Sequence, residues 1–382
     1  MPYPLLFSPL AIKGKTAPNR FVSQPMEAND SDQGKVSERA IMRYKKLAAG
    51  KWGIVFVEAL SVSASSLARK NGMILNRDNL GGFRRLVGEF KKIDPRALLI
   101  FQISHSGNRS GDFSRKTSIC PRAEKNTEYL SAGEIEEIRR SFVEAAVLSA
   151  KAGADGIDFK MCHGYFGSEM LRPANTRPDI WGGSFENRTR FLKLSVPEIR
   201  TMVDNEGFLI GTRISMYEGI RGGTGTSGEN EIIEDLAETG KLIRLLESLG
   251  LDYLNVSAGI PGITSEITRP VPHGRYLYLH HFRYTRLAKE LCSKMKIIGS
   301  AYSLLKEEGL ALAEENIKKG YADFAGWGRQ SLADPLFPQK VSENKKINFC
   351  EACSGCTRLM QRQVNIGCIL YDQYYSDLHK NK

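Results

Sequence analysis

The sequence has no uninterrupted apolar run near the roughly 18 residues that a membrane-spanning helix needs. Its first ten residues carry neither a basic stretch nor a small-residue cleavage site, so we expect no signal peptide and a cytoplasmic location. Low-complexity linkers and internal repeats are also missing. These absences exclude a solenoid and indicate a folded chain that does not cross a membrane.

The chain also has no concentrated block of charge. It contains 54 Lys and Arg against 43 Asp and Glu, a formal net charge of +11, but its basic residues are scattered, as in Arg43-Tyr-Lys45-Lys46. No RNA-binding signature accompanies them. We therefore expect a mixed, solvated surface and no nucleic-acid partner, although anionic small molecules also suit this balance.

Short apolar runs rich in β-branched residues alternate with longer amphipathic stretches. Helical spacing is found in Glu134–Ala152, Glu231–Leu249 and Leu305–Lys319. The predicted strands are Arg20–Ser23, Gly53–Glu58, Ala97–Ile103, Gly156–Phe159, Leu209–Ile214, Tyr253–Ser257, Lys296–Gly299 and Ala322–Gly328. Buried strands that are each followed by a helix predict parallel pairing, and eight such units fit a (β/α)8 TIM barrel. An open doubly wound sheet is the alternative.

In a barrel of this kind, functional residues lie at the carboxyl ends of the strands. Polar or glycine residues follow all eight predicted strands, and those after the last two strands indicate a phosphate site. Glycine lets a phosphate approach backbone N–H groups, a helix N-terminus favours the anion, and Arg329 adds positive charge. The sequence thus predicts a phosphorylated ligand at Gly299, Ser300, Gly328 and Arg329.

Cysteine is sparse except near the end of the chain. Cys120, Cys162 and Cys292 are isolated and are expected to be small buried residues. Cys350, Cys353, Cys356 and Cys368 instead form a C-x2-C-x2-C-x11-C cluster. Four thiolates at this density fit a [4Fe–4S] cluster or a structural zinc ion, and four unligated thiols are the third alternative.

Several segments, in this order and spacing, resemble the old yellow enzyme family of NAD(P)H:flavin oxidoreductases. They are Leu6–Leu10, Asn19–Val22, Gln102–Gly107, Ala154–Phe159, His163–Tyr165, Asn175–Asp179, Trp181–Arg188 and Gly326–Pro335. The resemblance implies FMN in the barrel, NADH or NADPH as hydride donor, and the C=C bond of an α,β-unsaturated carbonyl compound as acceptor.

The resemblance also implies roles for individual residues. Tyr165 matches the proton donor, His163 is a donor to the substrate carbonyl, and Gln102 and Arg213 contact the pyrimidine edge of the flavin. A cation there is physically sensible because reduced flavin is anionic at N1 and O2. The full expected FMN-binding set is Pro25, Met26, Glu27, Ala59, Gln102, Arg213, Gly299, Ser300, Gly328 and Arg329.

Two residues depart from the family pattern. Lys160 stands three residues before His163 where relatives carry a histidine, and it either polarises a carbonyl, binds a carboxylate, or is neutralised by Asp158 or another acid. Glu27 replaces a small polar or thiol residue near the flavin. An acid at this position is expected to oppose the anionic reduced flavin and lower its potential.

Gly223-x-Gly225-x-x-Gly228 spells a dinucleotide-binding fingerprint, but that motif works only directly after a strand and at the start of a helix. Here it falls inside the loop after the fifth predicted strand. We therefore interpret it as a flexible rim loop of the active site and not as a Rossmann site.

The cysteine spacing is similar to that of the family branch represented by 2,4-dienoyl-CoA reductase and trimethylamine dehydrogenase, which favours [4Fe–4S]. We expect a barrel over residues 1–345 and a Cys-rich extension over 346–382 packed on it. The first hypothesis is an FMN-dependent ene-reductase. The alternatives are a flavin/iron–sulfur dehydrogenase that passes electrons to a ferredoxin-like carrier, and a non-catalytic phosphate-binding barrel with structural zinc. A homo-oligomer is compatible with each hypothesis.

Overall fold

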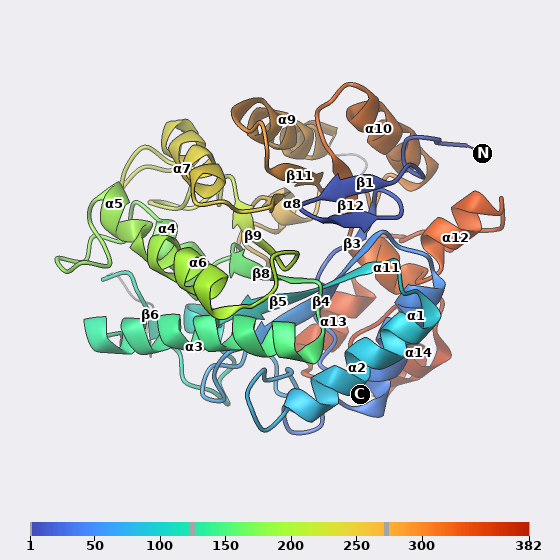
Figure 1. Cartoon of the computed structure of the whole chain (residues 1–382), viewed down its shortest axis with the longest axis horizontal. Coiled ribbons are helices and arrows are strands. Elements are labelled where there is room, and N and C mark those ends of the chain that lie inside the picture. Colours follow the sequence, from blue (N-terminus) through green and yellow to red (C-terminus); the bar gives the residue numbers. More distant parts are fainter. Residues whose placement is uncertain (1, 122–126, 271–274, 382) are drawn as a thin grey trace.

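The computed structural model describes residues 2–121, 127–270 and 275–381. Within these residues, eight parallel strands close into a barrel that is surrounded by helices (Figure 1). β12 pairs with β3 and completes the ring, so the barrel prediction is confirmed and an open sheet is excluded. In chain order the barrel strands are β3 (Phe21–Ser23), β4 (Ile54–Ser61), β5 (Leu98–Ser104), β8 (Gly156–Met161), β9 (Leu209–Ser215), β10 (Tyr253–Ser257), β11 (Lys296–Gly299) and β12 (Phe324–Trp327).

The helices that follow the strands pack their apolar faces onto the outside of the barrel. They are α1 (Glu38–Ala49), α2 (Leu80–Ile93), α3 (Ala132–Ala152), α6 (Arg190–Met202), α7 (Ala237–Ser248), α9 (Arg275–Leu291) and α10 (Lys306–Lys318). Shorter helices lie in the loops or near the chain end: α4 (Phe166–Leu171), α5 (Phe185–Arg188), α8 (Ser265–Thr268), α11 (Arg329–Ala333) and α12 (Phe337–Ser342). No helix in the described ranges is long and apolar enough to span a membrane.

The amino end of the barrel is closed by a hairpin of β1 (Leu10–Ile12) and β2 (Lys15–Ala17). Ile12 and Ala17 pack with buried side chains from the barrel strands, such as Phe56 and Tyr253, in a separate apolar cluster. Because apolar side chains fill this end, space for a ligand is found at the opposite, carboxyl end. A second small pair, β6 (Thr117–Ser118) and β7 (Glu128–Tyr129), lies in the loop after β5.

Two helix boundaries differ from the predicted ones for local reasons. α3 begins at Ala132, before the predicted Glu134, because the Ser131 side chain caps the Glu134 N–H and Glu134 reaches back to the Ser131 N–H. α7 begins at Ala237 and not at Glu231. Residues 231–236 form a loop in which Ile233 is 75% exposed, so their apolar spacing is not used for packing.

The C-terminal segment, residues 349–381, contains α13 (Gly355–Gln361) and α14 (Gln373–Lys380). The Gln330 side chain holds its start, donating to the Asn348 carbonyl and accepting from the Cys350 N–H, both at 3.0 Å. Farther on, the Ile366 N–H donates to the Ala28 carbonyl at 2.8 Å. α14 lies beside α1, with Arg39 3.7 Å from the centroid of the Tyr374 ring (Figure 1). The segment therefore packs on the barrel.

Candidate active site

A cavity of about 570 Å³ opens at the carboxyl end of the barrel, within the size range of small-molecule sites. It is lined by strand ends on one side and by α13 on the other. Two expected flavin-binding residues, Ala59 and Gly299, are not among its lining residues. The expected residues that do line it are Pro25, Met26, Glu27, Gln102, Lys160, His163, Tyr165, Arg213, Ser300, Gly328 and Arg329.

The floor of the cavity carries Gln102 from β5 and Arg213 from β9. The Gln102 Nε2 donates to Asp158 Oδ2 at 2.7 Å, which leaves its amide oxygen free to meet a ligand. Asp158 is therefore the partner of Gln102, and burial raises the pKa of this carboxyl group to about 7. The buried Arg213 Nε finds no hydrogen-bond partner among the described residues, and burial lowers the pKa of this guanidinium.

His163 lies in a turn directly after β8. Both His163 and Gly164 have left-handed backbone conformations, with φ of 63° and 77°. The glycine adopts this conformation at little cost, whereas it is uncommon for histidine. The turn places His163 Nε2 2.7 Å from the Ser257 hydroxyl, which also accepts a hydrogen bond from Arg213 Nη2 at 3.3 Å. Burial, together with the Arg213 and Lys160 charges, holds the pKa of His163 well below its usual range, so the ring is neutral.

The same turn delivers Tyr165 to Glu27, and the two form a buried network with Lys160 and Arg69. The Tyr165 hydroxyl donates to Glu27 Oε1. Lys160 Nζ donates to the same oxygen at 3.3 Å and lies 3.4 Å from the centroid of the Tyr165 ring. Arg69 Nε donates to Glu27 Oε2 at 2.5 Å. Of the three alternatives for Lys160, the structure thus shows neutralisation by an acid, and that acid is Glu27.

Arg69 and Lys160 keep the buried Glu27 carboxyl group ionised. Burial opposes its ionisation, but Arg69 and Lys160 outweigh burial and hold the pKa of Glu27 well below its usual range. Burial and the Glu27 carboxylate in turn raise the pKa of Tyr165, so the phenol is protonated at neutral pH. The expectation that Glu27 lowers a flavin potential assumed an unpaired carboxylate. In the structure Glu27 is not unpaired, because the network carries two positive charges and one negative charge.

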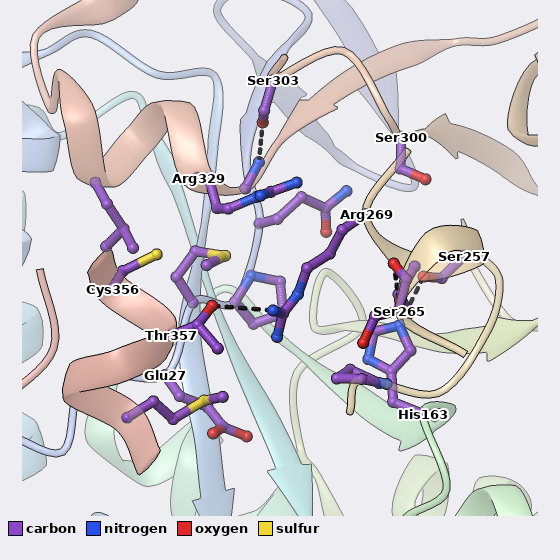
Figure 2. A pocket seen from close by; sticks show the side chains of 18 of the residues that line it. Glu27, His163, Ser257, Ser265, Arg269, Ser300, Ser303, Arg329, Cys356 and Thr357 are labelled. Carbon is purple, nitrogen blue, oxygen red and sulfur yellow. Dashed lines mark hydrogen bonds between the residues drawn. The ribbon is translucent and has the colours of Figure 1, made fainter. Parts of the chain in front are cut away.

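The loops after β11 and β12 meet at the proposed phosphate site. The Gly328 N–H donates to the Ser303 hydroxyl at 2.9 Å, and Arg329 extends from the next residue (Figure 2). A Cβ at Gly326 would lie 2.1 Å from Gln24 Nε2, and one at Gly328 would lie 3.0 Å from Met26 Sδ. A Cβ at Gly326 would also lie 2.9 Å from the Gly299 carbonyl oxygen, so a side chain does not fit there, whereas at Gly328 a Cβ fits only if Met26 shifts.

The clustered cysteines are divided between the cavity and the surface beside it. Cys356 on α13 lines the cavity, whereas Cys350, Cys353 and Cys368 do not. Burial raises the pKa of the Cys350 thiol to about 11. Across residues 2–121, 127–270 and 275–381, however, no three His, Cys, Asp or Glu side chains lie close enough to hold a metal ion. The isolated Cys120, Cys162 and Cys292 are buried, as predicted.

The interpretation of residues 223–228 as a rim loop is wrong. Gly223–Thr226 are buried, and the Thr224 N–H donates to the buried Glu218 carboxylate at 3.0 Å. Glu218 also pairs with Arg172 at 2.7 Å. No residue of this loop lines the cavity within the described chain. The ion pair of Glu218 with Arg172 therefore holds this loop in a buried position that is not part of the cavity wall.

Several cavity residues were not singled out from the sequence. Arg69 and Arg269 come from loops after β4 and β10, and Thr357 and Met360 come from α13. None of these belongs to a glycine-rich or strand-end motif. Arg109 did carry a signal, because it lies two residues after the Gln102–Gly107 motif. His281 on α9 also reaches the cavity, 3.2 Å from the Ser300 hydroxyl.

The fold and site together define a barrel enzyme whose chemistry lies at the carboxyl ends of its strands. The model of the NADH:flavin oxidoreductase / NADH oxidase family matches residues 5–348. The chain therefore belongs to this family of FMN-dependent, NAD(P)H-using oxidoreductases.

Individual relatives support this assignment. An NADH oxidase from Thermoanaerobacter brockii is 31% identical, with 96% of this chain and 54% of that protein covered. An NADPH dehydrogenase from Halalkalibacterium halodurans is 28% identical, with 88% of this chain and 94% of that protein covered. The chain thus spans about half the length of the first relative and almost all of the second. A solved structure of 2-naphthoyl-CoA reductase has the same fold, with a TM-score of 0.83, 22% identity, and coverage of 98% of this chain and 58% of that one.

Proposed function

We propose that this protein is an ene-reductase that transfers a hydride from NADH or NADPH, through FMN, to the C=C bond of an α,β-unsaturated carbonyl compound. When bound, FMN supplies reversible two-electron chemistry by taking up a hydride and giving it back. The protein's part is to bind the flavin and to hold the acceptor carbonyl. It also supplies the proton that completes reduction.

The observation that carries this proposal is the Arg213 guanidinium at the cavity floor. Its Nε has no partner among the described residues, and its recorded side-chain contact is the neutral Ser257 hydroxyl. A cation held this way suits a planar ligand whose edge becomes negative on reduction. Gln102, fixed by Asp158, presents an amide oxygen to the same edge, which suits an N–H donor on the ligand.

The phosphate of FMN would be held at Ser300, Gly328 and Arg329. The Gly328 N–H donates to the Ser303 hydroxyl in the structure, and a phosphate oxygen would compete with that hydroxyl for the same N–H. The sequence places these groups directly after the seventh and eighth strands, where phosphate sites in barrels are usual. Pro25 and Met26, which also line the cavity, would contact the ring system.

Tyr165 is the proposed proton donor to the α-carbon of the acceptor. At rest the Tyr165–Glu27–Lys160–Arg69 network holds two cations and one anion. Loss of the phenolic proton makes the charges equal, so Lys160 and Arg69 stabilise the tyrosinate that forms. Neutral His163 can donate one ring N–H to the carbonyl oxygen of the acceptor, which polarises the alkene.

A labelled nicotinamide tests the proposal. Protein purified without oxygen is analysed for FMN and FAD and is then supplied with deuterated NADH or NADPH and 2-cyclohexenone. We expect FMN, and cyclohexanone that carries deuterium at the β-carbon. Stoichiometric FAD, or unreduced cyclohexenone alongside nicotinamide oxidation by oxygen alone, would contradict it.

A second candidate is a flavin/iron–sulfur dehydrogenase that passes electrons to a ferredoxin-like carrier. It is favoured by Cys356, which lines the cavity, and by the C-x2-C-x2-C-x11-C spacing of the four cysteines in the sequence. If oxidation of an amine, and not of nicotinamide, bleaches the flavin, this candidate is favoured.

We further propose that residues 1–345 form the catalytic unit in the cytoplasm. Residues 346–382 would form a separate redox or structural unit. The family match ends at residue 348, close to this boundary.

A further inference from the structure

Positive charge greatly exceeds negative charge around the cavity. Six cationic side chains line it in the described part of the chain, and Glu27 is the one carboxylate among the lining residues. Histidines are left out of this count, because burial lowers the pKa of both His163 and His281 and favours their neutral forms. The six cations are Arg69, Arg109, Lys160, Arg213, Arg269 and Arg329.

Four of these cations have assigned partners. Arg69 and Lys160 share the Glu27 carboxylate. Under the proposed function, Arg213 meets the pyrimidine edge of FMN and Arg329 meets its phosphate. This leaves Arg109 and Arg269 without a negative charge.

Both remaining arginines contact neutral oxygens. Arg109 Nη2 donates to the Pro261 carbonyl at 2.9 Å. Arg269 Nη1 donates to the Thr357 hydroxyl at 2.9 Å, and its side chain extends into the cavity between Arg329 and His163 (Figure 2). Neither forms an ion pair with an acid in residues 2–121, 127–270 or 275–381. Each guanidinium has five N–H donors, so most of them are available to a ligand.

The two arginines are connected through the loop after β10. Arg109 binds the Pro261 carbonyl of this loop, Arg269 belongs to the same loop, and Gly262, Ser265 and Thr268 between them in the sequence also line the cavity. Arg109 follows β5, which lies across the barrel from β11 in the strand order, so it is remote from the proposed phosphate site. Half-buried guanidinium groups without counter-ions are unfavourable, and an anionic ligand removes that cost.

Resting on the proposed function, we infer that the acceptor carries a carboxylate or phosphate group remote from its C=C bond, and that Arg109 and Arg269 bind this group. The acceptor is therefore an anionic unsaturated carbonyl compound. An uncharged cyclic enone would occupy the reacting position, but it would leave Arg109 and Arg269 without an anion to bind.

A matched pair of acceptors tests the inference: (E)-6-oxohept-4-enoate and its methyl ester, which share the same enone and differ only at a group two methylenes away from the C=C bond. Because charge-assisted hydrogen bonds are involved, we expect the holoenzyme to favour the carboxylate in kcat/KM by roughly 10- to 100-fold. Arg109→Gln and Arg269→Gln should lose most of that preference while the ester rate and FMN content stay the same. Arg84→Gln, which removes an exposed charge on α2, is the control and should keep the preference.

Binding without turnover separates this inference from the proposed function. The saturated analogues 6-oxoheptanoate and methyl 6-oxoheptanoate lack the C=C bond, and their binding to the oxidised holoenzyme is followed through the flavin spectrum. Tighter binding of 6-oxoheptanoate, lost in Arg109→Gln and Arg269→Gln, supports the anion site even if neither alkene is reduced. Equal binding and equal kcat/KM for acid and ester would overturn it. Loss of FMN affinity in Arg269→Gln, with the preference kept, would assign this residue to the cofactor and overturn its role here.

Discussion

The barrel and the C-terminal segment are stabilised in different ways. Every barrel strand is largely buried, and an extended cluster of apolar side chains lies between the strands and their helices. In residues 349–381 the buried apolar side chains are Leu359 and Ile366, and Leu370 is 48% exposed. The segment is held by hydrogen bonds to barrel residues such as Gln330 and by Arg43, which pairs with Asp30 and donates to the Ile366 carbonyl.

This difference predicts different roles for the barrel and the C-terminal segment. A large apolar core gives the barrel a fixed cavity, so the groups at its strand ends keep their positions. The segment has too little apolar burial to fold alone, and a metal group bound by its cysteines would add the missing stability. Substitutions in the barrel should therefore change chemistry, whereas substitutions in the segment should change order and metal content.

The largest expected effect is on the barrel side. Tyr165→Phe removes the proposed proton donor and should slow enone reduction by roughly 10²–10⁴-fold, the range typical for loss of a general acid. Flavin reduction by nicotinamide needs no proton from this residue and should be nearly unchanged. Stopped-flow absorbance measures both half-reactions, and an equal loss in both would remove Tyr165 from this role.

The corresponding test of the segment is Cys353→Ala, because this cysteine is exposed and its removal costs little packing. Under the flavin/iron–sulfur candidate, anaerobic wild-type protein should contain about four irons per chain, and the variant should lose them. The segment should then be cleaved faster by protease, while the barrel stays intact. Cys292→Ala, outside the cluster, should keep its iron. Stoichiometric zinc in wild-type protein would replace the iron–sulfur assignment with a structural metal site.

A smaller effect is expected at the phosphate site. Arg329→Ala should weaken FMN binding by roughly 10- to 100-fold, as expected for a lost charge-assisted contact. Arg84→Ala removes the same charge from the outer surface and should leave the affinity unchanged. Fluorescence titration of the apoprotein with FMN gives both values, and unchanged affinity in Arg329→Ala would place the phosphate elsewhere.

The smallest effect concerns Glu58, which lies beneath the segment and accepts a hydrogen bond from the Ala28 N–H at 2.8 Å. Burial raises the pKa of this carboxyl group from 4.5 to about 7. Its favourable contribution to folding is therefore complete below pH 4.5 and is lost as the pH rises through 7. Urea unfolding at pH 5 and pH 8 should show that wild type loses on the order of 1–2 kcal/mol more than Glu58→Gln. If the free energy of unfolding changes equally with pH in the two proteins, the pKa of Glu58 is not raised in the folded state.

Most of the barrel could be predicted from the sequence because its strands are buried on both faces. Runs such as Gly53–Glu58 and Ala97–Ile103 are apolar along their whole length, and β4 and β5 follow them closely. The strand ends are predicted for the same reason, and Gln102, Tyr165 and Arg213 at or after these ends do line one cavity. The start of α7 could not be predicted, because Ile232 and Ile233 continue the helical spacing of apolar residues although they lie in an exposed loop.

The partners within the site could not be predicted because they depend on contacts between distant parts of the chain. The sequence marks Glu27 as an unusual acid, but its partner Arg69 comes from a loop 42 residues away. Arg269 meets Thr357 across 88 residues. Loops of this kind have no hydrophobic periodicity, so the positions of their side chains depend on the folded barrel and cannot be predicted from the sequence pattern.

Sequential mixing of anaerobic wild type and Cys353→Ala tests the central claim most directly. Each protein is mixed first with NADPH or NADH and then with 2-cyclohexenone, while the flavin absorbance is followed. Under the proposed function, the groups that hydride transfer and protonation need belong to the barrel, so both proteins should bleach with nicotinamide and recover with the enone at similar rates. If folded, FMN-loaded Cys353→Ala bleaches but does not recover, the electrons leave through the C-terminal segment and the account is contradicted.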